Sequence, residues 1–190
     1  HVEAGLRSFN MRMPEEINRI LTDRISDILF VPTDSAIKNL EAEGFKNFNS
    51  TIVKNGDVMQ DAAMYYAENS EKNSKIISQL SLKNFVLATL HREENTNDKN
   101  VLQRLISSLN KINEEIPVVI PLHPRTKKIL SQNNFDVKFK LIDPVGYFDM
   151  IELLKNCSLV MTDSGGLQKE AFFFHKHCLT NKKCLPCRLG

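Results

Sequence analysis

A glycine turn followed one helical turn later by a carboxylate is the most informative feature of this sequence. Ser164, Gly165 and Gly166 come after a short apolar run and before a helix-compatible run. Backbone N–H groups at a helix N-terminus attract anions, because they lack partners within the helix and the helix dipole favours negative charge. Glu170 follows one turn later, where its carboxylate can accept hydrogen bonds from two adjacent hydroxyls. These residues predict a nucleotide or nucleotide-sugar site, but an ordinary strand-to-helix turn with a serine cap fits them equally well.

Two carboxylates near the beginning of the chain, Glu3 and Glu15, are of a type suited to proton transfer. Paired carboxylates can serve as acid and base when their surroundings separate their pKa values. Glu15 and Glu16 also stand at the start of a predicted helix, where negative charge stabilises the helix. From the residues alone, that structural role is the better explanation for Glu15, whereas Glu3 has no such alternative.

Two histidine-containing segments follow predicted strands. His91 and Arg92 come directly after the predicted strand 85–90, and His123 comes after the predicted strand 117–121. A histidine at the carboxyl end of a strand can bind phosphate or act as an acid, and an arginine can bind a diphosphate through two hydrogen bonds. Polar loops without any ligand explain both segments equally well.

The elements that must position these residues alternate between strand-like and helix-like runs, which predicts an α/β fold with parallel sheets and helices on both faces. The expected helices are 14–27, 34–44, 58–80 with a polar interruption, 98–113, 127–131, 147–155 and 167–174. The expected strands are 28–31, 51–53, 85–90, 117–121, 139–142 and 158–161. Ligands bind beyond the carboxyl ends of parallel strands, where the histidine segments and the glycine turn are expected.

Composition sets wide bounds on function. The 190 residues are 42% apolar and 25% charged with a net charge of +2, which is ordinary for a globular protein and argues against a nucleic-acid partner. No run of about 18 apolar residues occurs and no signal-like start is present, so we expect no membrane span and a cytoplasmic location. Because the chain opens with His1 inside a strand-like segment, we also expect that an N-terminal part is absent.

The cysteines near the end of the chain raise the question of a metal. Cys184 and Cys187 form one half of a possible zinc motif, with Cys178 and two histidines upstream. One half-motif is a weak match, so we predict no metal site. Disulfides are not expected in a cytoplasmic protein.

Several motifs in fixed order carry a family resemblance. They are His1-Val2-Glu3-Ala4-Gly5-Leu6-Arg7, Pro14-Glu15-Glu16 with Asn18-Arg19, Thr89 with His91-Arg92-Glu93 and Asn95, Asp143-Pro144 with Tyr147, and Thr162-Asp163-Ser164-Gly165-Gly166 with Gln168 and Glu170-Ala171. Together they resemble the non-hydrolysing UDP-N-acetylglucosamine 2-epimerases and the close relative that acts on UDP-2,3-diacetamido-glucuronic acid. The resemblance covers roughly positions 1–174.

The resemblance implies two Rossmann-like domains arranged as in GT-B proteins, the first of them incomplete. Residues 1–83 would be the later part of the first domain with connecting helices, and residues 84–174 the UDP-binding domain. Residues 175–190 do not continue as the family does, and we favour a reading-frame change as the explanation for this atypical tail. That explanation would also remove the zinc hypothesis.

The implied reaction inverts C2 of UDP-GlcNAc to give UDP-ManNAc, by elimination and re-addition of UDP, without a cofactor or metal. The resemblance also implies a homodimeric full-length parent, of which this chain alone would be an inactive fragment. By motif, the matching residues are Glu3, Glu15 and His91 for catalysis, Ser164, Gly165, Gly166 and Glu170 for UDP binding, and, with weaker support, Arg92 and His123 for substrate contacts.

Other functions fit parts of the same pattern. The segment His123-Pro124-Arg125-Thr126 resembles the diacetamido-glucuronate branch more than the enzymes regulated by their own substrate. A GT-B glycosyltransferase would share the glycine turn and the acid after it, and a non-catalytic UDP-sugar binder would need only these. A small zinc-stabilised interaction module is the remaining alternative.

Overall fold

The computed structural model describes residues 1–90, 93–122, 124–133 and 135–180. They form two compact units, one spanning His1–Ala62 and a larger one starting at Ala63. The division falls within helix α3 (Val58–Asn73).

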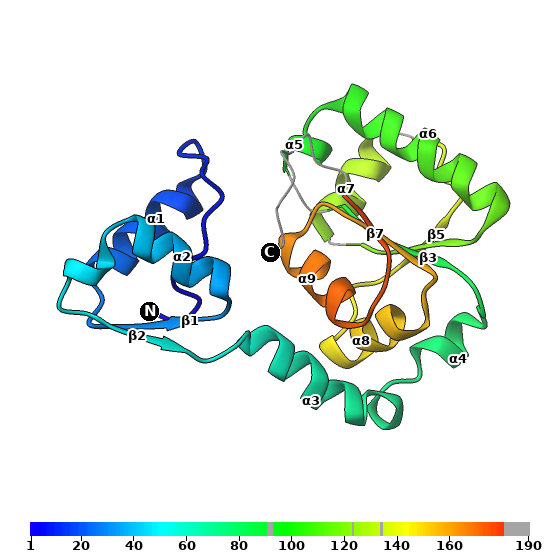
Figure 1. Cartoon of the computed structure of the whole chain (residues 1–190). Helices are drawn as coiled ribbons and strands as arrows, with labels where there is room; N and C mark the ends of the chain where they lie inside the picture. The colour runs from blue at the N-terminus through cyan, green and yellow to red at the C-terminus, as the bar shows by residue number, and fades with distance from the viewer. Residues whose placement is uncertain (91–92, 123, 134, 181–190) are drawn as a thin grey trace. The chain divides into compact units, whose positions relative to one another are not determined.

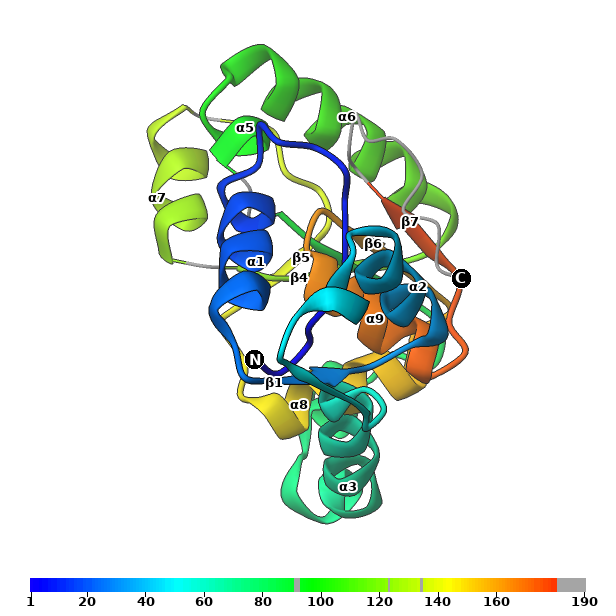
Figure 2. The same ribbon diagram turned by 60° about the vertical axis from the view of Figure 1, so that its left-hand side comes forward.

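The first unit is a small α/β unit built on two parallel strands. Its elements are α1 (Pro14–Ile25), β1 (Ile28–Val31), α2 (Asp34–Ala42), the 3-10 turn η1 (Phe45–Asn47) and β2 (Thr51–Lys54). Proline at the first helical position starts α1, and the Thr33 hydroxyl caps α2 by accepting from the Ala36 amide. Both helices lie on the same side of the β1–β2 pair (Figure 1, Figure 2).

The second unit contains a five-stranded parallel sheet. Its elements after α3 are α4 (Ile76–Leu80), β3 (Val86–Thr89), α5 (Glu93–Thr96), α6 (Lys99–Glu115), β4 (Val118–Pro121), α7 (Pro124–Gln132), β5 (Lys140–Ile142), α8 (Tyr147–Asn156), β6 (Leu159–Thr162), α9 (Gly165–Phe173) and β7 (Cys178–Thr180). The strand order is β5-β4-β3-β6-β7, and every neighbouring pair is parallel.

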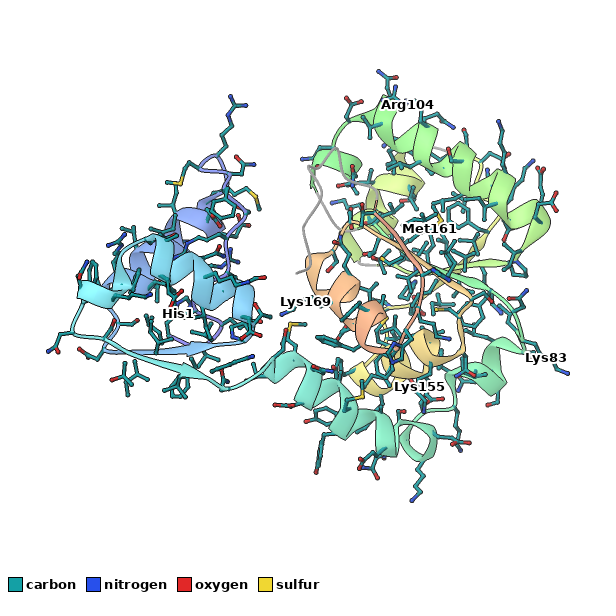
Figure 3. The ribbon with its side chains drawn as sticks, viewed as in Figure 1. His1, Lys83, Arg104, Lys155, Met161 and Lys169 are labelled. Carbon is teal, nitrogen blue, oxygen red and sulfur yellow. The ribbon has the colours of Figure 1, made fainter. Side chains whose placement is uncertain are left out.

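Alternating side chains of β3 divide the core of this unit into two layers. Val86 and Ala88 belong to the cluster that includes the apolar face of α6, whereas Leu87 belongs to the cluster with α8 and α9. Figure 1 shows α6 on one side of the sheet and α8 and α9 on the other. Met161 lies in the α6 layer, while Arg104 points outward from that helix (Figure 3). The sheet is therefore buried on both faces, as parallel sheets require.

Helix α3 is fastened to the second unit by a buried polar cluster. The Ser70 hydroxyl donates to Glu152 Oε1 at 2.5 Å, and Lys155 Nζ donates to the same oxygen at 2.7 Å. Lys155 also reaches the Ala67 carbonyl, so it lies between α8 and α3 (Figure 3). These contacts explain why the later part of α3 belongs to the larger unit.

The predicted fold class, an α/β fold with parallel sheets, is confirmed. Helices α5, η1 and strand β7 were not expected, and α3 runs through the predicted polar interruption to Asn73 before breaking. The expected domain boundary after residue 83 stays a prediction; the compact units divide earlier, within α3, and α4 lies in the larger unit.

Candidate functional site

The glycine turn is anchored to the sheet by a pair of buried threonines. Strand β6 ends at Thr162, and the Ser164 amide donates to the Thr162 hydroxyl oxygen at 2.9 Å. The hydroxyl oxygens of Thr162 and Thr89, on neighbouring strands, are 2.6 Å apart. Ser164 is the N-cap of α9 and accepts from the Leu167 amide at 3.5 Å. The turn therefore presents the start of α9 from a fixed position.

Gly165 is not required by the fold itself. It is the first residue of α9 and is exposed, and a Cβ added to it would meet no atom within 4 Å. Its φ lies outside the left-handed region that favours glycine. The missing side chain instead leaves room beside the first N–H groups of the helix. A helix start that is open in this way is an arrangement that can accept an anion.

A hydrogen bond joins two of the predicted motifs. Asn95 Nδ2 donates to Asp163 Oδ2 at 2.8 Å, and Asp163 is 0% exposed. The segment after β3 is thereby tied to the segment after β6. The next helix, α6, is capped by Asp98. The sequence did not reveal the hydrogen bond between Asn95 and Asp163, because the two residues lie 68 positions apart.

Glu170 has a single hydrogen-bond donor in the described part of the chain. Tyr147 Oη, at the start of α8, donates to Glu170 Oε1 at 3.0 Å. Burial raises the pKa of Glu170, and the bond from Tyr147 partly opposes this rise. Burial and the nearby carboxylate raise the pKa of Tyr147 to about 12. One carboxylate oxygen is thus occupied, while the group keeps further lone pairs for a ligand.

The two adjacent glutamates of α1 differ sharply. Glu16 is 1% exposed and accepts from the backbone amides of Ser8 and Phe9 and from Arg19. Although burial alone would raise the pKa of Glu16, these hydrogen bonds and the Arg19 charge lower it overall. Glu15 is exposed, and within the described ranges it makes no hydrogen bond or ion pair. Glu15 is accordingly available to a ligand, whereas Glu16 holds the preceding loop.

The segment that carries Glu3 is fixed by a buried ion-pair network that the sequence did not reveal. The Arg7 side chain is 1% exposed, with its guanidinium 2.7 Å from Asp23 Oδ2 and 2.6 Å from Glu43 Oε1. The Gly5 amide also donates to Asp23. Gly5 has φ +76, and a Cβ there would lie 2.5 Å from the Ala36 carbonyl oxygen. Glu3 itself is half-buried with φ 66, in a segment held against α1 and α2.

Three predicted site residues, His91, Arg92 and His123, lie outside the described residues, as do Cys184 and Cys187. Among the residues that are described, no group of three His, Cys, Asp or Glu side chains could hold a metal ion. No described helix is long and apolar enough to cross a membrane. Glu3 and Glu15 belong to the first unit, whereas the glycine turn and Glu170 belong to the second.

A parallel sheet with a glycine turn beyond an inner strand defines the second unit as Rossmann-like. The family model described as UDP-N-acetylglucosamine 2-epimerase matches residues 1–183. The chain therefore belongs to the UDP-N-acetylglucosamine 2-epimerase family, and the resemblance found in the motifs is confirmed. The match reaches further than the motifs do, and β7, which pairs with β6, lies in this added part. The reading-frame explanation stays a prediction.

Individual relatives agree with this assignment. The chain is 55% identical over 181 residues to the UDP-2,3-diacetamido-2,3-dideoxy-D-glucuronate 2-epimerase of Pseudomonas aeruginosa, covering 95% of this chain and 50% of that protein. It is 43% identical over 192 residues to a UDP-N-acetylglucosamine 2-epimerase of Methanococcus maripaludis, covering 95% and 52%. The crystal structure of the Methanocaldococcus jannaschii UDP-GlcNAc 2-epimerase in complex with UDP-GlcNAc and UDP superposes with a TM-score of 0.82 at 40% identity, covering 96% and 53%. The chain spans about half the length of these relatives.

Proposed function

We propose that this chain is part of a non-hydrolysing epimerase that inverts C2 of a UDP-linked 2-acetamido sugar, converting UDP-GlcNAc to UDP-ManNAc. One observation carries the proposal: in a member of this family, the open turn at Gly165 begins a helix that presents Glu170 one turn later. Membership of the family alone would not say which residues of this chain bind the nucleotide.

The second unit supplies the groups that would bind UDP. The free N–H groups at the start of α9, with Ser164, Gly165 and Gly166, would hold the diphosphate. Glu170 would accept hydrogen bonds from the ribose hydroxyls. Because UDP is the leaving group, donors aimed at the diphosphate would stabilise the negative charge that develops as the C–O bond breaks.

Carboxylates are the groups suited to the sugar end of the reaction. The C2 hydrogen is weakly acidic, so cleavage of the bond to UDP must run ahead and leave positive charge on the sugar. Glu3 and Glu15 would stabilise that charge and move the proton, with His91 as a further catalytic group and Arg92 and His123 as contacts to the substrate. Glu15, which is exposed and has no partner among the described residues, suits this role, and the buried Glu16 does not. The reaction is redox-neutral, and the proposal includes no cofactor.

The second candidate substrate is UDP-2,3-diacetamido-glucuronate. The 55% identity to the Pseudomonas aeruginosa enzyme supports it as an alternative to UDP-GlcNAc, the substrate named for the Methanococcus maripaludis enzyme, to which this chain is 43% identical. The segment 123–126 resembles the same branch. Both substrates require the same inversion at C2, so the choice between them leaves the proposed chemistry unchanged. A homodimeric full-length protein in the cytoplasm completes the proposal.

Solvent exchange at C2 tests the reaction. A protein of the relatives' full length that contains this sequence is incubated in D₂O with each UDP-sugar in turn, and mass spectrometry and NMR follow the sugar. We expect deuterium at C2 together with the inverted product for one of the two substrates. A glycosyltransferase or a UDP-sugar binder would retain UDP binding with no exchange, and that result would refute the proposal.

A further inference from the structure

We propose that Tyr147 is a positioning residue that holds the Glu170 carboxylate in the orientation in which it accepts the hydroxyl groups of a ribose. This inference rests on the proposed function, since it deepens the role of Glu170 in binding the nucleotide. Tyr147 would touch the carboxylate and not the reacting atoms.

The hydrogen bond from Tyr147 on α8 to Glu170 on α9 occupies only one of the two carboxylate oxygens. Tyr147 Oη donates to Oε1 of Glu170 at 3.0 Å, so that oxygen has a fixed partner. An ionised carboxylate offers about four lone-pair sites, and a diol needs only two of them. Without the tyrosine hydroxyl, the glutamate side chain would be free to sample other rotamers, and each binding event would have to order it again.

The position of the hydroxyl is set by neighbours other than Glu170. The rings of Tyr66, on α3, and Tyr147 pack edge to face, with centroids 5.4 Å apart and an interplanar angle of 89°. Tyr66 makes a similar contact with Phe148, at 5.4 Å and 80°. Edge-to-face pairs of this kind fix ring orientation. Tyr147 is therefore held from α3 and α8, and it can impose an orientation on a glutamate from α9.

The charge state of Glu170 depends on the same contact. Burial raises the pKa of Glu170, and the Tyr147 hydrogen bond lowers it. Within the described ranges, Tyr147 is the titratable side chain that influences this pKa. Because a carboxylate must be ionised to accept two hydroxyls, loss of the donor weakens binding most strongly at low pH.

Titration calorimetry of the chain with UDP and with 2′-deoxy-UDP tests the inference. The unchanged protein should bind UDP more tightly than 2′-deoxy-UDP, because the latter lacks one of the two hydroxyls. Tyr147→Phe keeps the ring and removes the donor, so the affinity for UDP should fall about threefold to tenfold, the value of one hydrogen bond. The affinity for 2′-deoxy-UDP should fall less, and the acid limb of UDP binding should move to higher pH.

Tyr65→Phe is the matched control, because Tyr65 is 67% exposed on the same helix as Tyr66 and its hydroxyl has no contact with Glu170. It should leave both affinities and the pH profile unchanged. In a Glu170→Gln background, Tyr147→Phe should have a much smaller effect on the preference for UDP. Circular dichroism of each variant checks that the fold is retained. If the Tyr147→Phe single variant is unstable, the comparison of Glu170→Gln with the Glu170→Gln, Tyr147→Phe double variant still tests the inference.

Equal losses for UDP and 2′-deoxy-UDP with an unmoved pH profile would overturn the inference while leaving the nucleotide site intact. Equal effects of Tyr147→Phe with and without the Glu170 carboxylate would overturn it as well. If the unchanged protein binds UDP with no preference over 2′-deoxy-UDP, the role proposed for Glu170 fails, and the inference fails with it.

Discussion

At the scale of single residues, burial separates side chains that look alike in the sequence. Glu15 and Glu16 are the same residue type at the same helix start, and the helix dipole offers both the same explanation. The structure buries one beneath the loop that precedes α1 and exposes the other. One sequence contains no signal that distinguishes them, because the difference depends on where residues 8 and 9 fold back.

The first prediction concerns this pair. Glu16→Gln should destabilise the first unit by about 1–3 kcal/mol at pH 7, because an ionised acceptor of two backbone amides is lost. The folded-state pKa of Glu16 is lowered, so its contribution is fully present above the unfolded pKa of about 4.3 and is lost as the pH falls through the lower folded value. Urea unfolding followed by circular dichroism should show the difference at pH 7 and a smaller one below about pH 4.

Glu15→Gln is the control for stability and the test for catalysis. It should lower the free energy of unfolding by less than about 1 kcal/mol, because the side chain is exposed and unpaired within the described residues and only its charge at the helix N-terminus is lost. In the full-length protein it should lower turnover by about 100-fold or more, as expected for loss of a group that transfers protons. Unchanged turnover would remove Glu15 from the proposed mechanism.

The second prediction contrasts two glycines. Gly165→Ala should change stability by less than about 0.5 kcal/mol, since the added methyl group meets open space, yet weaken UDP binding by about tenfold or more. Gly5→Ala should instead cost about 2 kcal/mol or more, because of its positive φ and the close carbonyl of Ala36. Thermal unfolding and calorimetry with UDP measure both effects. Undiminished UDP affinity in Gly165→Ala would contradict a phosphate site at the turn.

At the scale of elements, helices with a strong apolar periodicity were predicted correctly, and the shortest helices and strands were missed. Helix α6 was expected at 98–113 and runs over Lys99–Glu115, because its apolar residues recur at helical spacing and Asp98 caps it. Strand β7 was missed, since three residues with two exposed side chains at the edge of a sheet show no alternation that a sequence could reveal. Helix α5 is a single short turn with no periodic pattern.

The third prediction concerns the link between the loops after β3 and β6. Asn95→Ala removes the amide that donates to Asp163 and leaves a buried carboxylate with one fewer partner, which should cost about 1–3 kcal/mol. Asn100→Ala, an exposed change in α6, should stay within about 0.5 kcal/mol. Both are measured by urea unfolding. Equal stabilities for the two variants would show that the link contributes little.

At the scale of the whole molecule, the chain consists of two units with separate cores, and the predicted site residues are divided between them. Residue types and spacing pointed to both groups as candidates, and the order of the motifs assigned them to one family. Contacts such as Arg7 with Glu43, or Asn95 with Asp163, join residues far apart in the chain, and no local pattern predicts them. The type of each site residue was readable from the sequence, but its surroundings were not.

The fourth prediction follows from this division. The groups proposed to bind UDP all lie in the second unit, so UDP should slow amide hydrogen exchange at residues 163–167 and leave the amides of β1 unchanged. Hydrogen exchange read by mass spectrometry, with and without saturating UDP, measures this. Protection confined to the first unit would place the nucleotide elsewhere.

The hydrogen bond between the hydroxyl groups of Thr89 and Thr162 has an evolutionary consequence. The two oxygens face each other across neighbouring strands, and both side chains are buried. Loss of the hydroxyl at one position therefore removes the hydrogen bond between the two strands' side chains. A substitution at position 89 or position 162 alone should consequently be rare among relatives, and the two positions should change together. Ser164 adds a constraint, since its amide depends on Thr162, and lineages that replace the pair must find a new acceptor for it.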